Sequence, residues 1–416
     1  MKNFLKNKLF YLIILGILLR LIIIPITIHP DIAGYNFVSY VISQKGQLLS
    51  FYDYLATLPQ DNPLVRLYGV DVFIYPPLLY LAFAAFMKIL SPFYPWETYQ
   101  NLLLGFEKVF GDPNLPKLLF LLKGPLLVFD LLGLILIRKL FDKTKEKFLA
   151  AILWLFNPLI FYTSYMMSQF DVIIALSILA ALYFYKQKNN YLGAVSLGLG
   201  GLIKMFPLLL LPLFAFSASQ KISERAKLIF LGLLVYFVGI LPYLPSAGFR
   251  QSALLAPQTD KIFFAKIPVS GAEFLPLFLV GLVFLFWVAY FWGEKLKPWQ
   301  WFLTALLLFY SVVHFHPNWF IWLSAPIIIY LISFWPKSIL PAATLFICFL
   351  VIIFVSFDTS LNIGFFRMLS PGVMDFSFSN LIARFYQPNI LASVVRGVLA
   401  ATSFFMITQF FAKTKN

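Results

Sequence analysis

The chain has 416 residues, of which 61% are hydrophobic, 19% aromatic and only 12% charged. A soluble fold cannot bury that much apolar surface, and the apolar runs do not alternate as barrel strands do. The composition therefore predicts an all-α polytopic membrane protein. The formal net charge of +15 does not indicate a nucleic-acid partner, because most Lys and Arg residues lie in short breaks between apolar runs.

The first apolar run, residues 9–28, predicts a first membrane span. Lys2, Lys6 and Lys8 precede it, and no small-residue cleavage site follows it, so we expect an uncleaved span rather than a signal peptide. Basic clusters mark the cytosolic side, and the chain must cross the membrane an even number of times between successive clusters. These clusters lie at 2–8, 138–147, 186–188, 221–227, 295–297, 337 and 413–415.

This parity rule predicts about 12 spans, with both termini in the cytosol. The stretch 75–90 is too short for a span and would break the parity, so we expect an interface helix inside a large external loop, 29–116. Residues 191–216 are too few for two full spans and predict a shallow hairpin broken near Lys204. Residues 1–416 then form one membrane domain. Its other spans are expected at 117–138, 148–165, 171–186, 228–244, 274–292, 299–313, 319–335, 338–356 and 390–411, with further external loops at 245–273 and 357–389.

Short polar segments converge on the external face under this topology. HPDIAGY (29–35) follows the first span, SQFD (168–171) and HFHPN (314–318) lie at outer turns, and IKMFP (203–207) lies at the tip of the shallow hairpin. All three histidines of the chain fall in these segments. A polar set gathered on one face of a membrane protein predicts a functional site.

The residue types suit glycosyl transfer from a lipid-phosphate sugar. A carboxylate such as Asp31 takes the proton from an acceptor hydroxyl, while Lys204, His314 and His316 neutralise the phosphate that leaves. No acidic residue lies within about twenty positions of Asp31, which argues against a metal-bound diphosphate. Cys348 is the only cysteine, so we expect no disulfide and no Cys-based metal site. Neither a metal nor a cofactor is expected.

The order and spacing of these motifs resemble the integral-membrane C-type glycosyltransferases that use polyprenyl-phosphate sugars. The nearest resemblance is to bacterial relatives of the GPI mannosyltransferases, with the dolichyl-phosphate-glucose-dependent glucosyltransferases more distant. The segments concerned are HPDIAGYNFVSY, KGQLLSFYDY, VFIYPPLLYL, LPKLLFLLKGPLLVFDLL, WLFNPLIFYTSYMMSQFD, GGLIKMFPLLLLP and HFHPNWFIWLSAP. The resemblance implies the GT-C fold, with interface helices in the first external loop and Asp31 as the catalytic base. It also implies a polyprenyl-phosphate donor.

Two turns depart from the pattern of that family. The chain has Ser168-Gln169-Phe170-Asp171 where the family often has Gly-Gln-Asp or Trp-Gly-Gln. It has His316-Pro317-Asn318-Trp319 where the family often has His-Glu-Arg-Tyr.

Each candidate residue also has a structural interpretation. Asp31 alone is an ordinary interfacial acid, and Asp71, a second carboxylate candidate, is also placed to cap the helix that follows it. Tyr75 precedes Pro76-Pro77, which fixes the start of that helix, and is a further candidate for substrate contact.

The candidates in the second half of the site have similar alternatives. Asp171, with Gln169 beside it, either caps the span that begins there or contacts a substrate. Lys204 either snorkels to the interface or contacts a phosphate. His314 and His316 are two apart, not the i, i+4 spacing of a metal pair on one helix.

Lys123 and Asp130 lie seven residues apart on one face of a span. We expect them to hold the bundle together by pairing with neighbouring helices rather than to act on a substrate.

The sequence thus predicts an inverting glycosyltransferase that moves a sugar, with mannose expected, from a polyprenyl-phosphate donor to an external lipid or glycan acceptor. The site would lie on the extracytoplasmic face of a bacterial membrane, with membrane lipids as partners and no nucleic acid. The alternative is a lipid or sugar transporter or flippase, but transporters tend to show internal repeats and polar residues at the bilayer midplane. The sequence leaves the sugar and the acceptor open.

Overall fold

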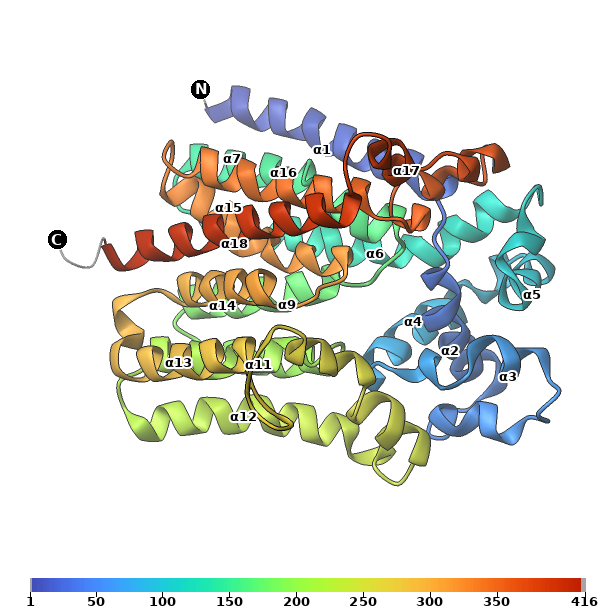
Figure 1. Cartoon of the computed structure of the whole chain (residues 1–416), viewed down its shortest axis with the longest axis horizontal. Coiled ribbons are helices and arrows are strands. Elements are labelled where there is room, and N and C mark those ends of the chain that lie inside the picture. The colour runs from blue at the N-terminus through green and yellow to red at the C-terminus, as the bar shows by residue number, and fades with distance from the viewer. Residues whose placement is uncertain (1, 413–416) are drawn as a thin grey trace.

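The computed structural model describes residues 2–412, except for the side chains of residues 2–6, 70, 71, 257, 371 and 374. Long apolar helices lie roughly parallel in one bundle, and shorter helices pack across one end of it (Figure 1). The predicted all-α polytopic membrane fold is confirmed. Within the described residues, six helical segments are long and apolar enough to cross a membrane: Asn7–Ile26, Leu115–Lys139, Thr144–Met166, Ile222–Tyr243, Leu277–Lys295 and Pro388–Ala412.

Helices lie at each of the predicted spans, although 148–165 is divided among α7, α8 and a π-helix, and 319–335 begins in a 3-10 helix (Pro317–Leu323). The expected hairpin at 191–216 is α10 and α11, separated by a short break that contains Lys204. The start of α1 and the end of α18 lie at the same end of the bundle, on the left in Figure 1. The bundle helices are α1 (Lys2–Ile26), α6 (Leu115–Lys139), α7 (Thr144–Leu155), α8 (Pro158–Ile160), α9 (Val172–Lys186), α10 (Asn190–Gly201), α11 (Phe206–Ala218), α12 (Ile222–Ile240), α13 (Leu277–Trp292), α14 (Pro298–Val312), α15 (Ser324–Ser333), α16 (Ile339–Val355) and α18 (Pro388–Ala412).

The first long loop folds into a helical cap at the right-hand end of the bundle in Figure 1. The expected interface helix is α4, which begins at Pro77, where a proline is tolerated because its missing N–H needs no partner in a first turn. One face of α4 is buried against α2, and the Leu78 N–H donates to the Leu202 carbonyl at 3.1 Å, which ties the cap to the α10–α11 break. The cap helices are α2 (Asp31–Lys45), η1 (Phe51–Thr57), α3 (Pro63–Tyr68), η2 (Val70–Phe73), α4 (Pro77–Leu90), η3 (Ser91–Phe93), α5 (Trp96–Leu104) and η4 (Phe106–Val109).

The other two predicted external loops carry more structure than the sequence indicated. Residues 245–276 hold the π-helix η7, the 3-10 helix η8 and an exposed antiparallel hairpin, and the last loop holds short helices. The elements are η6 (Leu241–Tyr243), η7 (Phe249–Leu254), η8 (Pro257–Phe263), β1 (Lys266–Ser270), β2 (Glu273–Pro276), η9 (Gly293–Lys295), η11 (Thr359–Leu361), η12 (Ile363–Phe366), η13 (Pro371–Asp375) and α17 (Phe378–Ala383).

A buried polar network joins α1 and α6 to the π-helix η5 (Phe161–Met166). The Arg20 Nε donates to Asp130 Oδ2 at 2.6 Å, and that oxygen also accepts the Tyr165 hydroxyl at 2.6 Å. Lys123 Nζ donates to the carbonyl oxygens of Thr27 at 2.5 Å and Tyr165 at 2.8 Å. Buried charges need such partners, and these contacts match the bundle-holding role expected for Lys123 and Asp130.

The hairpin α10–α11 packs closely against α12 because glycines allow the backbones to approach. A Cβ added to Gly198 would lie 2.4 Å from the Gly232 carbonyl oxygen. Small residues at helix crossings are typical of membrane bundles, where close packing replaces the hydrophobic driving force. This contact fixes the position of the break that carries Lys204.

Candidate functional site

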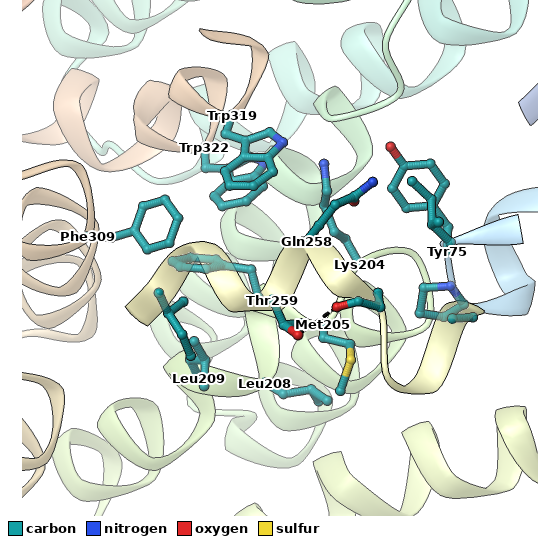
Figure 2. Close-up of a pocket in the computed structure, with 16 residues that line it drawn as sticks. Tyr75, Lys204, Met205, Leu208, Leu209, Gln258, Thr259, Phe309, Trp319 and Trp322 are labelled. Carbon is teal, nitrogen blue, oxygen red and sulfur yellow. Dashed lines mark hydrogen bonds between the residues drawn. The ribbon is translucent and has the colours of Figure 1, made fainter. Parts of the chain in front are cut away.

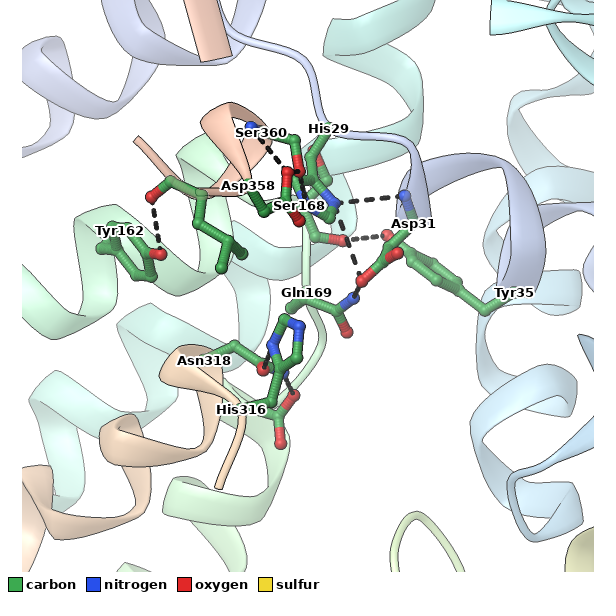
Figure 3. Close-up of polar contacts among 12 residues, drawn as sticks. His29, Asp31, Tyr35, Tyr162, Ser168, Gln169, His316, Asn318, Asp358 and Ser360 are labelled. Carbon is green, nitrogen blue, oxygen red and sulfur yellow. Dashed lines mark hydrogen bonds and ion pairs between the residues drawn. The ribbon is translucent and has the colours of Figure 1, made fainter. Parts of the chain in front are cut away.

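Asp31 begins α2 directly beyond the end of the first span, after Pro25 near the end of α1 and Pro30 at the turn. Its carboxylate accepts a hydrogen bond from Gln169 Nε2 at 2.5 Å (Figure 3). The side chain remains 44% exposed and lines a polar chamber of about 310 Å³ between the cap and the bundle. The chamber is lined by Asp31, Gly34, Tyr35, Val72, Ile74, Tyr75, Gln169, Gln258, Lys261, His316, Asn318 and Trp319.

The turn that carries Gln169 is held in an unusual backbone conformation. Ser168 has a φ of 58°, the left-handed region that non-glycine residues rarely adopt. The Tyr35 hydroxyl donates to the Ser168 carbonyl at 2.7 Å, and the Gln169 N–H donates to the Thr163 carbonyl at 2.8 Å. Gln169 Oε1 is buried without a hydrogen-bond partner among the described residues. Strained residues that the surrounding structure holds in place are typical of ligand sites.

His29 lies beside Asp31 and near Ser360, but the three side chains do not form a Ser-His-Asp triad that would activate the serine as a nucleophile. The Asp31 N–H donates to His29 Nδ1 at 3.2 Å, so the ring proton must lie on Nε2, which is 3.4 Å from Ser360 Oγ. The Ser360 hydroxyl donates its own proton to Asp358 Oδ1 at 2.6 Å. The imidazole therefore offers the serine a proton instead of accepting one. Burial lowers the pKa of His29, which keeps the ring neutral near pH 7.

Asp171 and Lys204 form a buried ion pair. Asp171 is fully buried and makes no capping hydrogen bond to α9, although it lies at the helix start. Its carboxylate accepts from Lys204 Nζ at 2.8 Å, from Asn318 Nδ2 at 2.7 Å and from Trp322 Nε1 at 2.8 Å. The charge of Lys204 is therefore paired inside the protein, within 5.1–5.5 Å of the centroids of four aromatic rings, those of Tyr75, Phe170, Trp319 and Trp322.

The structure separates the two histidines of the 314–318 turn. His316 Nδ1 lies 2.6 Å from Asn318 Oδ1 and its ring lines the polar chamber, where burial lowers its pKa. His314 is exposed, lies beside Phe264 and does not line the chamber. Tyr75 does line it, with its ring 4.8 Å from that of Phe170. The side chain of Asp71 lies outside the described residues.

The sequence did not single out Lys261 and Gln258, which η8 brings to the chamber. Lys261 Nζ lies 5.2 Å from the centroid of the Trp319 ring and makes no ion pair with the described carboxylates. Burial and, to a lesser extent, the charge of Lys204 lower its pKa. Lys261 is one of three cations in the 245–273 loop, with Arg250 and Lys266, so no local sequence signal distinguished it.

An apolar groove of about 290 Å³ adjoins the polar chamber (Figure 2). Met205, Leu208 and Leu209 of the α10–α11 hairpin form one wall, and Ile262, Phe309 and Trp322 lie around it. The groove and the chamber share four lining residues, Ile74, Tyr75, Gln258 and Trp319. The two spaces therefore adjoin along these four residues, with the apolar groove beside the bundle helices and the polar chamber beneath the cap.

No group of three His, Cys, Asp or Glu side chains within the described part of the chain is placed to hold a metal ion. The polar chamber offers one exposed carboxylate, Asp31, and one ammonium group without a carboxylate partner among the described residues, Lys261.

A family model described as the GPI transamidase subunit PIG-U matches residues 47–322. The matched segment contains Tyr75, the strained 168–171 turn, the hairpin α10–α11, η8 and the 314–318 turn. It begins after Asp31. No curated protein matches the chain.

This match contradicts the predicted function. The chain is not assigned to the glycosyltransferases that use polyprenyl-phosphate sugars, so the predicted hexosyl or mannosyl transfer, the polyprenyl-phosphate donor and the transporter alternative are all wrong. The expected bacterial membrane has no support either.

The geometry gives a physical reason for this correction. The prediction assigned the leaving phosphate to Lys204, His314 and His316. Lys204 is instead neutralised by Asp171, burial keeps the His316 ring neutral near pH 7, and His314 lies outside the chamber. The all-α membrane scaffold was predicted correctly, whereas the chemistry was not. Because the family match covers about two thirds of the chain, the chain belongs to the family of the GPI transamidase subunit PIG-U.

Proposed function

We propose that the chain is a lipid-holding subunit of a membrane complex of the GPI-transamidase type. In this role the apolar groove takes the tail of a phosphate-containing glycolipid, and the polar chamber takes its head group. The proposal rests chiefly on the adjacency of the two spaces, which share Ile74, Tyr75, Gln258 and Trp319 as lining residues. The proposal treats residues 1–416 as one membrane unit, with the chamber on the face opposite the basic helix ends.

The apolar groove suits a hydrocarbon tail. Its walls are aliphatic and aromatic side chains from the α10–α11 hairpin, η8 and α14, at the border between the helix bundle and the cap. Each methylene moved out of water contributes about 0.8 kcal/mol. A tail in this groove would fix the depth at which the head group enters the chamber.

The polar chamber suits a phosphorylated glycan. Lys261 supplies an ammonium group without a carboxylate partner among the described residues, and a lipid phosphate would pair with it. Asp31 and the unpartnered Oε1 of Gln169 would accept hydrogen bonds from sugar hydroxyls or from an amine. Tyr75 and Trp319 offer ring faces to the sugar.

The remaining candidates have a positioning role in this proposal. Asp171 and Lys204 orient the indole of Trp322 and the amide of Asn318, and Asn318 in turn orients His316. His314 lies outside the chamber and has no role in it.

Bond-making is assigned to a partner subunit. Attachment of a lipid anchor to a protein needs an activated nucleophile. The proton on His29 Nε2 points toward Ser360, so His29 does not act as a base that would activate the serine hydroxyl. Cys348, the only cysteine, lies buried in α16. The chain would therefore hold and present the glycolipid while another chain carries out the chemistry.

The test is direct binding of a photoactivatable glycosylated phosphatidylinositol to the purified chain in lipid nanodiscs. We expect Lys261→Ala to weaken binding about tenfold, because one charge-assisted contact is lost. Leu209→Trp would fill the groove and weaken binding independently of charge. The matched control is Lys266→Ala, which removes an exposed cation of the hairpin outside both spaces. Equal labelling of all four proteins would reject the proposal.

A further inference from the structure

A second cavity of about 300 Å³ lies at the opposite end of the bundle, where the Lys-rich helix ends are. It is formed by the last turns of α9 and α15, the first turn of α14 and the residues that follow α6. None of its lining residues lines the polar chamber or the apolar groove. We call it the basic-end cavity.

The charges around the basic-end cavity leave one cation without a partner. Lys186 Nζ donates to Asp142 Oδ1 at 2.7 Å and to the Leu140 carbonyl at 3.0 Å, so it neutralises the acid and caps α6. Lys297 is exposed and makes no ion pair or side-chain hydrogen bond with the described residues. Among the residues that line the cavity, the formal charges of Lys186, Lys297 and Asp142 leave one positive charge in excess, with Glu294 close enough to act on Tyr185.

Three residues with neutral donor groups also line the cavity: Tyr185, Trp299 and Ser333. The side-chain donors of these residues have no hydrogen-bond partner among the described residues. The remaining wall is apolar and includes Leu140, Leu182 and Ile329. An anion that is attached to a hydrocarbon would satisfy both kinds of surface at once.

We propose that the basic-end cavity binds the phosphate head group of an anionic membrane lipid, with Lys297 as its charged contact. The phosphate accepts hydrogen bonds from Lys297 and from the neutral donors, and the glycerol and first methylenes lie against the apolar wall. A free phosphate shares the head-group chemistry. However, it leaves the apolar wall uncovered, and one open cation holds a soluble dianion only weakly against water.

The test measures lipid retained by the full chain. Purified protein is exchanged from detergent into mixed micelles of phosphatidylcholine with phosphatidylglycerol, and the bound lipid is counted by native mass spectrometry. A parallel arm offers inorganic phosphate or glycerol phosphate without lipid, and the midpoint of thermal unfolding is recorded in each case. Binding of the lipid but not of the soluble phosphates identifies the membrane as the source.

Charge variants at two nearby positions separate this site from general attraction to basic helix ends. We expect Lys297→Glu to reduce retained phosphatidylglycerol about tenfold or more, and Lys297→Arg to restore it. The matched control is Lys295→Glu, which makes the same charge change at an exposed residue that does not line the cavity. Equal losses in Lys297→Glu and Lys295→Glu, or retention unchanged in both, would overturn the proposal. Binding of soluble phosphate with the affinity of the lipid would overturn its lipid assignment.

Discussion

At the scale of single residues, the site is decided by which charges are paired inside the protein. The sequence alone does not distinguish the charged side chains of Asp31, Asp171 and Lys204. In the structure, Asp171 and Lys204 are buried as an ion pair, whereas the Asp31 side chain remains exposed. The sequence identified most of the residues that gather here. It did not reveal the pairing, because Asp171 and Lys204 are 33 positions apart and meet only when the α10–α11 hairpin folds beside α9.

The buried pair Asp171–Lys204 predicts strongly non-additive mutations. Lys204→Met leaves a carboxylate at a fully buried position, so we expect a loss of about 3–5 kcal/mol in the free energy of unfolding. Asp171→Asn strands the ammonium group in the same way. The double variant removes both charges and should lose much less than the sum of the single variants, as measured by denaturant unfolding in detergent micelles. Additive losses would show that the two charges do not depend on each other.

At the scale of elements, helix bounds were predictable and loop structure was not. The spans and the broken hairpin follow from apolar run lengths and from basic clusters, which are local properties of the sequence. The 245–273 segment was predicted only as a further external loop without assigned elements, whereas its helix η8 brings Lys261 and Gln258 to the chamber. No local sequence pattern identifies Lys261 and Gln258 as chamber residues, because their role depends on where the loop lies against Trp319.

The crossing of α10 and α12 gives a prediction at this scale. Gly198→Ala would place a methyl group 2.4 Å from the Gly232 carbonyl oxygen, so the helices must separate. We expect a loss of about 1–3 kcal/mol in stability, together with weaker glycolipid binding, because the hairpin also forms the groove. The control is Gly397→Ala in α18, where no atom lies within 4 Å of the added carbon, so stability should stay the same or rise. Similar effects of the two substitutions would refute the close crossing.

At the scale of the whole molecule, the three histidines link stability to pH. Burial lowers the pKa of His29, His314 and His316 from the ordinary value of 6.5. Below about pH 6.5 the unfolded chain therefore binds more protons than the folded chain, and the free energy of unfolding falls as the pH drops further. Well above pH 6.5 these groups are neutral in both states and contribute no pH dependence.

The measurement is the midpoint of thermal unfolding in detergent between about pH 7.5 and about pH 5.5. We expect a decrease toward acid in the natural sequence and a shallower decrease in His316→Gln. His314→Gln is the comparison, because that ring is more exposed and its pKa is lowered with less burial. A midpoint that stays constant or rises toward pH 5.5 would contradict the lowered pKa values.

The partners of Asp171 also set an order of events during synthesis. The ribosome makes Asp171 before Lys204. Asn318 and Trp322, which donate hydrogen bonds to the Asp171 carboxylate, are made more than a hundred residues later. Until the ribosome passes Trp322, this carboxylate lacks two of its three donors and must stay near water or near the insertion machinery. The polar chamber is therefore completed late, and a nascent chain that stops before residue 318 presents an unfinished acidic site to the quality-control system of the membrane.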